Sequence, residues 1–160
     1  MGDNPKIVWL KRYLNLKRQV DNLKDELSVH ENAAYLPAMP ESDGSKHTPG
    51  RSDRMANATV KYMEKKQELM PIITSKESEM QAISNAIYAV KDPLKQEVLR
   101  LRYIKGDPGY RHMKWINVAL AMYHSDDESD EKRVTRLHGE ALLSLQMEDD
   151  STNEENNIYM

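Results

Sequence analysis

The stretch from Asp92 to Leu145 decides the fold. It contains three segments with helical patterns: DPLKQEVLRLRYIKG from Asp92, KWINVALAMY from Lys114, and SDEKRVTRLHGEALLSL from Ser129. In the first, Asp92 is a favourable N-cap, and Pro93 stands at the first helical position, where its missing N–H costs no hydrogen bond. Apolar residues then recur at helical spacing, at Leu94, Val98, Leu101 and Ile104, until Gly106 ends the pattern. The first segment is therefore predicted to be a capped amphipathic helix.

The second and third segments predict two further amphipathic helices. The second gathers apolar residues on one side: Trp115, Ile116, Ala119, Leu120 and Tyr123. In the third, the apolar residues of one face are Val134, Leu137, Ala141, Leu142 and Leu145. Three basic residues and a threonine lie on or beside the opposite face: Lys132, Arg133, Thr135 and Arg136. These last residue types donate hydrogen bonds to phosphates and to O6 and N7 of guanine in the major groove. The three segments together predict a helix-turn-helix, with the third helix as the DNA reader.

This stretch resembles region 4 of the sigma-70 family. It is more closely similar to the phage-encoded sigma-70 region 4-like regulators of late genes, the ArpU/RinA-type families. The matching residues are DP at 92–93, VLRLRYI at 98–104, WI at 115–116 with Ala119, and RVTRLHGEAL at 133–142, and the resemblance is clearest over about a third of the chain. It implies a sequence-specific, DNA-binding transcription regulator of phage late genes, an activator that acts with host RNA polymerase.

Two segments depart from the family pattern. The connector between Tyr103 and Trp115 is longer than usual, and a second insertion separates Tyr123 from Val134. The second carries five acidic residues between positions 126 and 131, and Ser125 with Glu128 is expected to form a capping box there. Acidic groups at a helix N-terminus favour the helix dipole, but they also repel phosphate.

The four basic residues of the first segment and of the connector complete the expected DNA surface. They are predicted to anchor the phosphate backbone: Arg102, Lys105, Arg111 and Lys114. Residues 92–146 hold nine Lys and Arg against nine Asp and Glu, but five of those acids fall in the second insertion. The rest of the stretch is therefore basic, whereas the tail at 147–160 has five acids and no base and is expected to be disordered.

Residues 5–34 are predicted to form one long helix with a heptad seam at Trp9, Tyr13, Leu16, Val20, Leu23, Leu27 and His30. Residues 35–52, with three prolines and two glycines, predict a flexible loop. Residues 53–91 predict a second long helix, kinked or broken near Pro71, with a seam at Met55, Tyr62, Leu69, Ile73, Met80, Ile83, Ile87 and Val90. The fold class is thus all-α: a coiled-coil-like hairpin over 1–91, then the helix-turn-helix over 92–146.

The hairpin is expected to join two copies of the chain, because its apolar seams are narrow for a finished core. A homodimer also suits a DNA reader that binds two half-sites. The residues predicted to carry this oligomerisation are Leu16, Val20, Leu23, Leu27, Met80, Ile83 and Ile87.

Composition and motifs bear on the cellular location and on whether an enzyme or a cofactor site is expected. The 160 residues include no Cys, no apolar run approaches the roughly 18 residues of a membrane helix, and no secretory signal is recognisable, so a cytoplasmic location, that of the host for a phage protein, is expected. No catalytic motif, metal-ligand spacing or phosphate loop appears, so we expect neither an enzyme nor a cofactor.

His138 is expected to be a half-buried structural residue, and Gly139 to permit a close approach to another helix or to DNA.

Two alternative functions stay open. The first is a protein-interaction module that binds RNA polymerase or another regulator without binding DNA, using its acidic segments. The second is a small-terminase-like DNA packaging protein, which also joins a helix-turn-helix to helical oligomerisation segments. Those proteins usually place the DNA unit first, the reverse of the order here.

Overall fold

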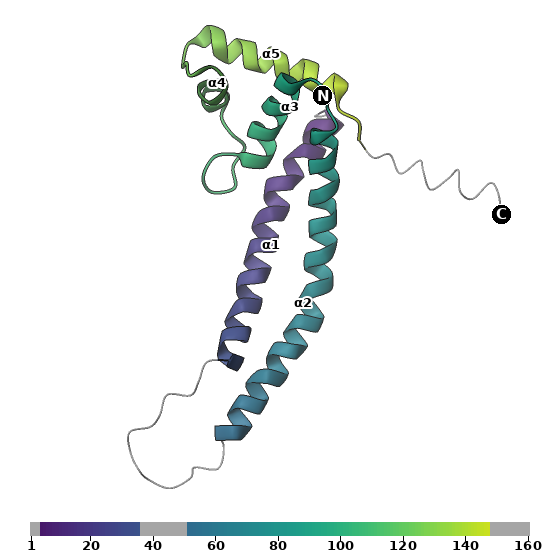
Figure 1. Cartoon of the computed structure of the whole chain (residues 1–160), viewed down its shortest axis with the longest axis vertical. Helices are drawn as coiled ribbons and strands as arrows, with labels where there is room; N and C mark the ends of the chain where they lie inside the picture. The colour runs from purple at the N-terminus through teal and green to yellow at the C-terminus, as the bar shows by residue number, and fades with distance from the viewer. Residues whose placement is uncertain (1–3, 36–50, 148–160) are drawn as a thin grey trace, which may run out of the picture. The chain divides into compact units, whose positions relative to one another are not determined.

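The computed structural model describes residues 4–35 and 51–147. The elements in chain order are α1 (Pro5–Tyr35), α2 (Arg51–Tyr88), α3 (Pro93–Leu99), the π-helical segment η1 (Arg100–Lys105), α4 (Trp115–Tyr123) and α5 (Glu128–Ser144), as labelled in Figure 1 except for η1. The predicted all-α fold is confirmed: α1 and α2 form a long hairpin, and three shorter packed helices follow. The predicted flexible loop and acidic tail lie largely outside the described residues.

The chain divides into two compact units. The first combines residues 1–17 with 78–160, and the second comprises residues 18–77. Helices α1 and α2 contribute to both units, so the predicted boundary between residues 91 and 92 falls inside the first unit. No helix in the described part of the chain is both long enough and apolar enough to cross a membrane.

In the second unit, α1 and α2 pair along a narrow apolar seam. Its buried hydrophobic side chains are Val20, Ala34, Tyr62, Leu69 and Ile73. Ion pairs bridge the two helices at its edges: Lys24 Nζ lies 3.1 Å from Glu77 Oε1, and Lys65 Nζ lies 3.4 Å from Glu26 Oε1. Val20, Tyr62, Leu69 and Ile73 were predicted to lie in the seam, and they are buried. Met55 was also predicted there but is 47% exposed, so the paired seam does not reach it.

Helix α2 continues through Pro71, so of the predicted kink or break the break does not occur. Proline removes the backbone bond to the carbonyl one turn earlier, here that of Gln67. Both Pro71 and Gln67 are exposed, and water can satisfy the freed carbonyl there. The interruption expected from the sequence is therefore tolerated without a change of element.

The main core lies in the first unit and joins the hairpin helices to the shorter ones. Its buried members are Leu10, Leu16, Ile83, Ile87, Val90, Leu99, Tyr103, Ala141, Leu142 and Leu145. Leu10 and the buried Leu14 lie off the seam predicted for α1. Leu14 lies beside the connector, where a Cβ on Gly106 would come within 2.8 Å of its Cδ1. The heptad pattern missed these leucines because they face the short helices and the connector.

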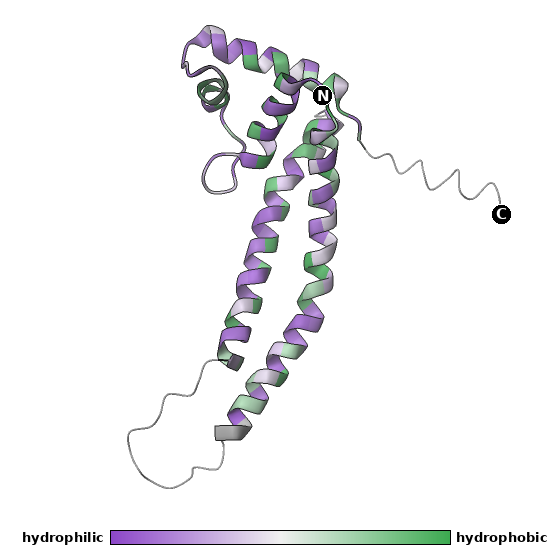
Figure 2. Ribbon diagram, in the orientation of Figure 1, coloured by the Kyte–Doolittle hydropathy of each residue, from purple (hydrophilic) through white to green (hydrophobic). Residues whose placement is uncertain are grey.

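A second core cluster supports α4. It consists of Leu101, Met113, Val118, Ala119 and Val134, with Trp115, Met122 and Tyr123 packed against it. Figure 2 shows α4 coloured as hydrophobic almost throughout, which is why the sequence alone could not identify its buried side.

Two predicted faces need correction. Leu94 is 52% exposed, because the segment from α3 into η1 buries Val98, Leu99, Leu101 and Tyr103 toward two separate cores. In α4, Ile116 and Leu120 are exposed, whereas Val118 and Ala119 are buried. The π-helical turns of η1 shift the register of the residues after Leu99, so that Tyr103 is buried and Ile104 only partly buried.

Candidate nucleic-acid interface

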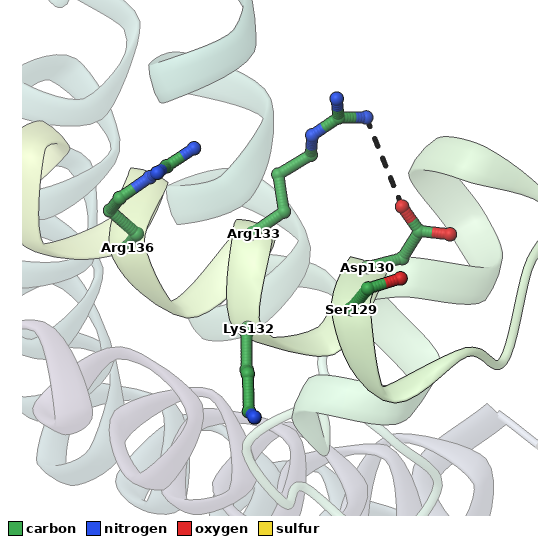
Figure 3. A pocket seen from close by; sticks show the side chains of 5 residues that line it. All are labelled: Ser129, Asp130, Lys132, Arg133 and Arg136. Carbon is green, nitrogen blue, oxygen red and sulfur yellow. Dashed lines mark ion pairs between the residues drawn. The ribbon is translucent and has the colours of Figure 1, made fainter.

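The exposed side of α5 carries the four residues predicted to read DNA. Lys132, Arg133, Thr135 and Arg136 are all exposed. Val134 and His138 are buried on the opposite side, so α5 packs one side against the core and exposes basic residues on the other. Lys132, Arg133 and Arg136 line a shallow hollow together with Ser129 and Asp130. In Figure 3, Arg133 and Arg136 extend to one side of α5, and Lys132 extends to the other. The structure thus exposes all the predicted reading residues on α5, but Lys132 points away from the two arginines.

Two of these cations already have acidic partners. Lys132 Nζ lies 3.3 Å from Glu128 Oε1, and Arg133 NH1 lies 3.8 Å from Asp130 Oδ1, the ion pair drawn in Figure 3. The Arg133 guanidinium also stands 5.1 Å from the centre of the Tyr123 ring. Among the described residues, Arg136 has no ion-pair partner. Arg136 therefore offers its full charge to a ligand, whereas the other two offer a partly neutralised one.

The hydroxyl of Thr135 is engaged by the helix itself. It donates a hydrogen bond to the Glu131 carbonyl, 2.9 Å away. This contact within the turn is common for threonine in helices, and the hydroxyl keeps its acceptor lone pairs. The side chain stays on the exposed side of α5 and remains within the predicted reading surface.

The acidic segment before α5 is partly helical. Helix α5 begins at Glu128, so the link from α4 has four residues, 124–127. His124 takes the left-handed conformation, with φ of 54°, and its N–H donates to the Leu120 carbonyl, which ends α4 sharply. The predicted Ser125–Glu128 capping box is wrong. Ser125 Oγ accepts a hydrogen bond of 3.2 Å from the N–H of Asp127, because the helix starts too late for a box.

The connector before α4 is held by Asp107. Its carboxylate accepts hydrogen bonds from the Lys114 N–H at 3.0 Å and from Asn117 Nδ2 at 3.1 and 3.2 Å, and so caps α4 from outside the helix. The Asp107 N–H also donates to the Arg111 carbonyl at 2.8 Å, which closes the loop. No local pattern in the sequence predicts this cap, because Asp107 lies ten positions from Asn117.

Gly106 makes that closed loop possible. Its φ of 62° and ψ of −175° suit glycine, and a Cβ there would lie 2.4 Å from the Arg111 carbonyl oxygen. The sequence suggested only that Gly106 ends a helix. The structure adds that this position excludes any side chain.

The four predicted backbone anchors fall into two groups. Lys105, Arg111 and Lys114 are exposed and available to a ligand. Arg102 is partly buried: its NH1 donates to the Met113 carbonyl, and its guanidinium stacks 4.3 Å from the centre of the Trp115 ring. Arg102 therefore serves mainly to hold η1 against the start of α4.

Beneath the basic side lies a buried aromatic cluster. Tyr103 Oη and His138 Nε2 share a hydrogen bond of 2.6 Å, and the Trp115 ring meets that of His138 edge-on at 4.7 Å. Burial, followed by the nearby Arg102 charge, lowers the pKa of His138 from 6.5 to about 4. The predicted structural role of His138 is confirmed, with the side chain only 7% exposed. The aromatic cluster fixes the orientation of α5 on the core.

Gly139 differs from its predicted surroundings. No atom of another described segment lies within 4 Å of the position that a Cβ would occupy. The expected close approach to another helix is therefore absent from the described part of the chain. The glycine leaves an open site on the exposed side of α5, one turn beyond Arg136.

Most of the predicted oligomerisation residues are buried within the single chain. Leu16, Val20, Ile83 and Ile87 belong to that group, and Leu23, Leu27 and Met80 are partly buried. A second copy of the chain would therefore have to meet other side chains of the hairpin.

Comparison with known proteins adds no relative: the chain matches no protein-family model, no curated protein and no solved structure.

Proposed function

We propose that this protein is a sequence-specific DNA-binding transcription regulator that reads the major groove with α5. The observation that carries the proposal is the basic, exposed side of α5, which combines Lys132, Arg133, Thr135 and Arg136. The short link from α4 and the buried side of α5 hold this surface on two packed helices. A rigid helix whose N-terminal half presents Arg, Lys and Thr suits base-edge and phosphate contacts.

The exposed connector cations extend the proposed footprint. Arg111 and Lys114 belong to the loop that Asp107 closes, and Lys105 precedes it. Their flexible side chains can neutralise phosphates without reading sequence. In this proposal, α5 reads the bases, and the connector cations contact phosphates and set the register of the protein on the duplex.

The biological setting rests on the sequence resemblance alone. The residues similar to sigma-70 region 4-like phage regulators support a role at late promoters, as an activator with host RNA polymerase. Binding as a homodimer to two half-sites belongs to the same proposal.

A protein-interaction module is the second candidate, and one observation favours it. Ile116 and Leu120, one turn apart on α4, are 39% and 42% exposed. Exposed apolar side chains on α4 and exposed acidic residues at 126–128 suit a protein partner with apolar and basic groups. Such a partner, RNA polymerase or another regulator, could be bound with or without DNA.

Selection from a random duplex library tests the proposal. The full chain, immobilised, should enrich a defined sequence over successive rounds, and Arg136→Ala should lose that enrichment. A library that stays random with the wild-type chain would contradict sequence-specific reading and favour the protein-interaction alternative.

A further inference from the structure

The second unit exposes a strip of uncharged side chains along α2. Residues three or four positions apart share one face of a helix, and six such positions follow each other with heptad spacing: Ala56, Val60, Met63, Gln67, Met70 and Thr74. All six are exposed, and Val60, Met63 and Met70 are 53%, 48% and 39% exposed. The strip is separate from the seam that faces α1, which contains Tyr62, Leu69 and Ile73.

The absence of charge from this strip is unusual for the chain. Charged residues make up 31% of the sequence, and an exposed helix face normally carries them. The described part of α1 in the same unit follows that norm on its side away from α2, with Arg18 and Asp25 exposed. The outer side of α1 is therefore the solvated side of this hairpin. Helix α2 has an exposed face without charged side chains, so a partner could cover that face without removing any charge from water.

We propose that this strip, the α2 strip, docks against the α2 strip of a second copy of the chain, with the two helices parallel. An uncharged heptad strip meets its own copy without repulsion between like charges, and a two-fold axis makes one surface complementary to itself. Within the unit, only five of the described hydrophobic side chains are buried, so a further helical layer covers surface that the hairpin leaves open.

The borders of the strip fix the direction of pairing. Glu64 lies on one border and Lys66 on the other, and both are exposed. In a parallel pair, the border of one helix that carries Glu64 faces the border of its partner that carries Lys66, so opposite charges meet on both sides. Gln67, at the centre of the strip, places a polar side chain opposite its own copy, a device that specifies register at some cost in stability.

This inference identifies the surface for the dimer assumed in the proposed function, but it does not depend on DNA binding. Light scattering after size exclusion of the full chain without DNA measures it directly. The wild type should have twice the 18.5 kDa mass of one chain. M63E/M70E should have the mass of one chain, with unchanged helical circular dichroism, because both side chains are exposed.

The matched control is Val29→Glu. Val29 is 67% exposed on α1 of the same unit, so it receives the same new charge outside the strip. That variant should keep the mass of the dimer. A monomeric wild type, or a dimer that survives in M63E/M70E, would overturn the proposal.

Direction is tested by cross-linking. The chain has no cysteine, so Thr74→Cys introduces a single thiol at one end of the strip, where two copies meet only if the helices are parallel. Mild oxidation should link two copies of this variant rapidly, whereas Val29→Cys should react only slowly. A Thr74→Cys dimer that links no faster than Val29→Cys would rule out parallel pairing at the strip.

Discussion

The hydroxyl of Tyr103 lies 2.6 Å from Nε2 of His138, and this buried hydrogen bond ties η1 to α5. The Trp115 ring packs against the same imidazole from the start of α4. One histidine therefore contacts both η1 and α4. The orientation of the proposed reading surface depends on His138 staying neutral.

The first prediction concerns pH. The pKa of His138 is lowered from 6.5 to about 4 in the folded chain. Between these values the unfolded chain binds a proton that the folded chain does not, so the free energy of unfolding falls as pH falls. The contribution is fully present above pH 6.5, and its loss approaches about 3 kcal/mol near pH 4, at about 1.4 kcal/mol per pH unit.

Urea unfolding at several pH values, wild type beside His138→Gln, isolates this contribution. The difference in unfolding free energy between the two proteins should shrink steadily from pH 6.5 to 4. A difference that is the same at all pH values would show that His138 is not held neutral.

The second prediction contrasts two glycines. Gly106→Ala forces a left-handed backbone on alanine, at about 1–3 kcal/mol, and adds the clash with the Arg111 carbonyl. Gly139→Ala meets open space in the middle of α5 and should stabilise the chain by up to about 1 kcal/mol. Thermal unfolding of both variants checks the opposite signs, and a destabilised Gly139→Ala would reveal a contact at that site.

The third prediction separates reading from anchoring. Arg136→Ala should cost about 1–3 kcal/mol of specific binding, because this exposed guanidinium has no ion-pair partner among the described residues. Lys114→Ala should instead weaken binding to all duplexes alike and reduce the salt dependence. Fluorescence anisotropy with a selected and a scrambled duplex distinguishes the two effects.

Glu140→Ala is the matched control for that series, since it removes an exposed charge on the same helix. Its affinity should not fall. Equal affinities of Arg136→Ala and wild type would remove Arg136 from the interface.

The fourth prediction concerns the acids at the start of α5. Glu128 and Asp130 pair with Lys132 and Arg133, and they also place negative charge beside the proposed phosphate path. Glu128→Gln with Asp130→Asn should raise DNA affinity several-fold. The same change should lower stability by about 0.3–1 kcal/mol for each acid lost from the helix N-terminus. Anisotropy and urea unfolding of the double variant measure both effects, and unchanged affinity would place these acids away from DNA.

The sequence predicted those features that depend on neighbouring residues. Asp92 accepts hydrogen bonds from the N–H groups of Leu94 and Lys95, as an N-cap should, and Gly106 ends the helical run. The two long helices also follow their heptad patterns. The basic side of α5 was predictable because its apolar residues repeat with the helical period.

What the sequence could not predict depends on contacts between distant residues. The π-helical turns of η1 changed which side chains of that segment are buried, and no local motif signals them. Arg102 was assigned to phosphate from its charge, but its stacking on Trp115 follows from how the connector folds back. The start of α5 at Glu128 was not predicted, because it has no side-chain cap of its own.

The affinity of the full chain for its selected duplex as salt is raised, measured beside a scrambled duplex, tests whether α5 reads DNA. Binding should be tight and should distinguish the two sequences, with an affinity that falls by a logarithmic slope of about −0.9 for each phosphate contact. Loss of discrimination in Arg136→Ala should accompany it. No binding to either duplex at low salt would contradict the claim that α5 reads DNA.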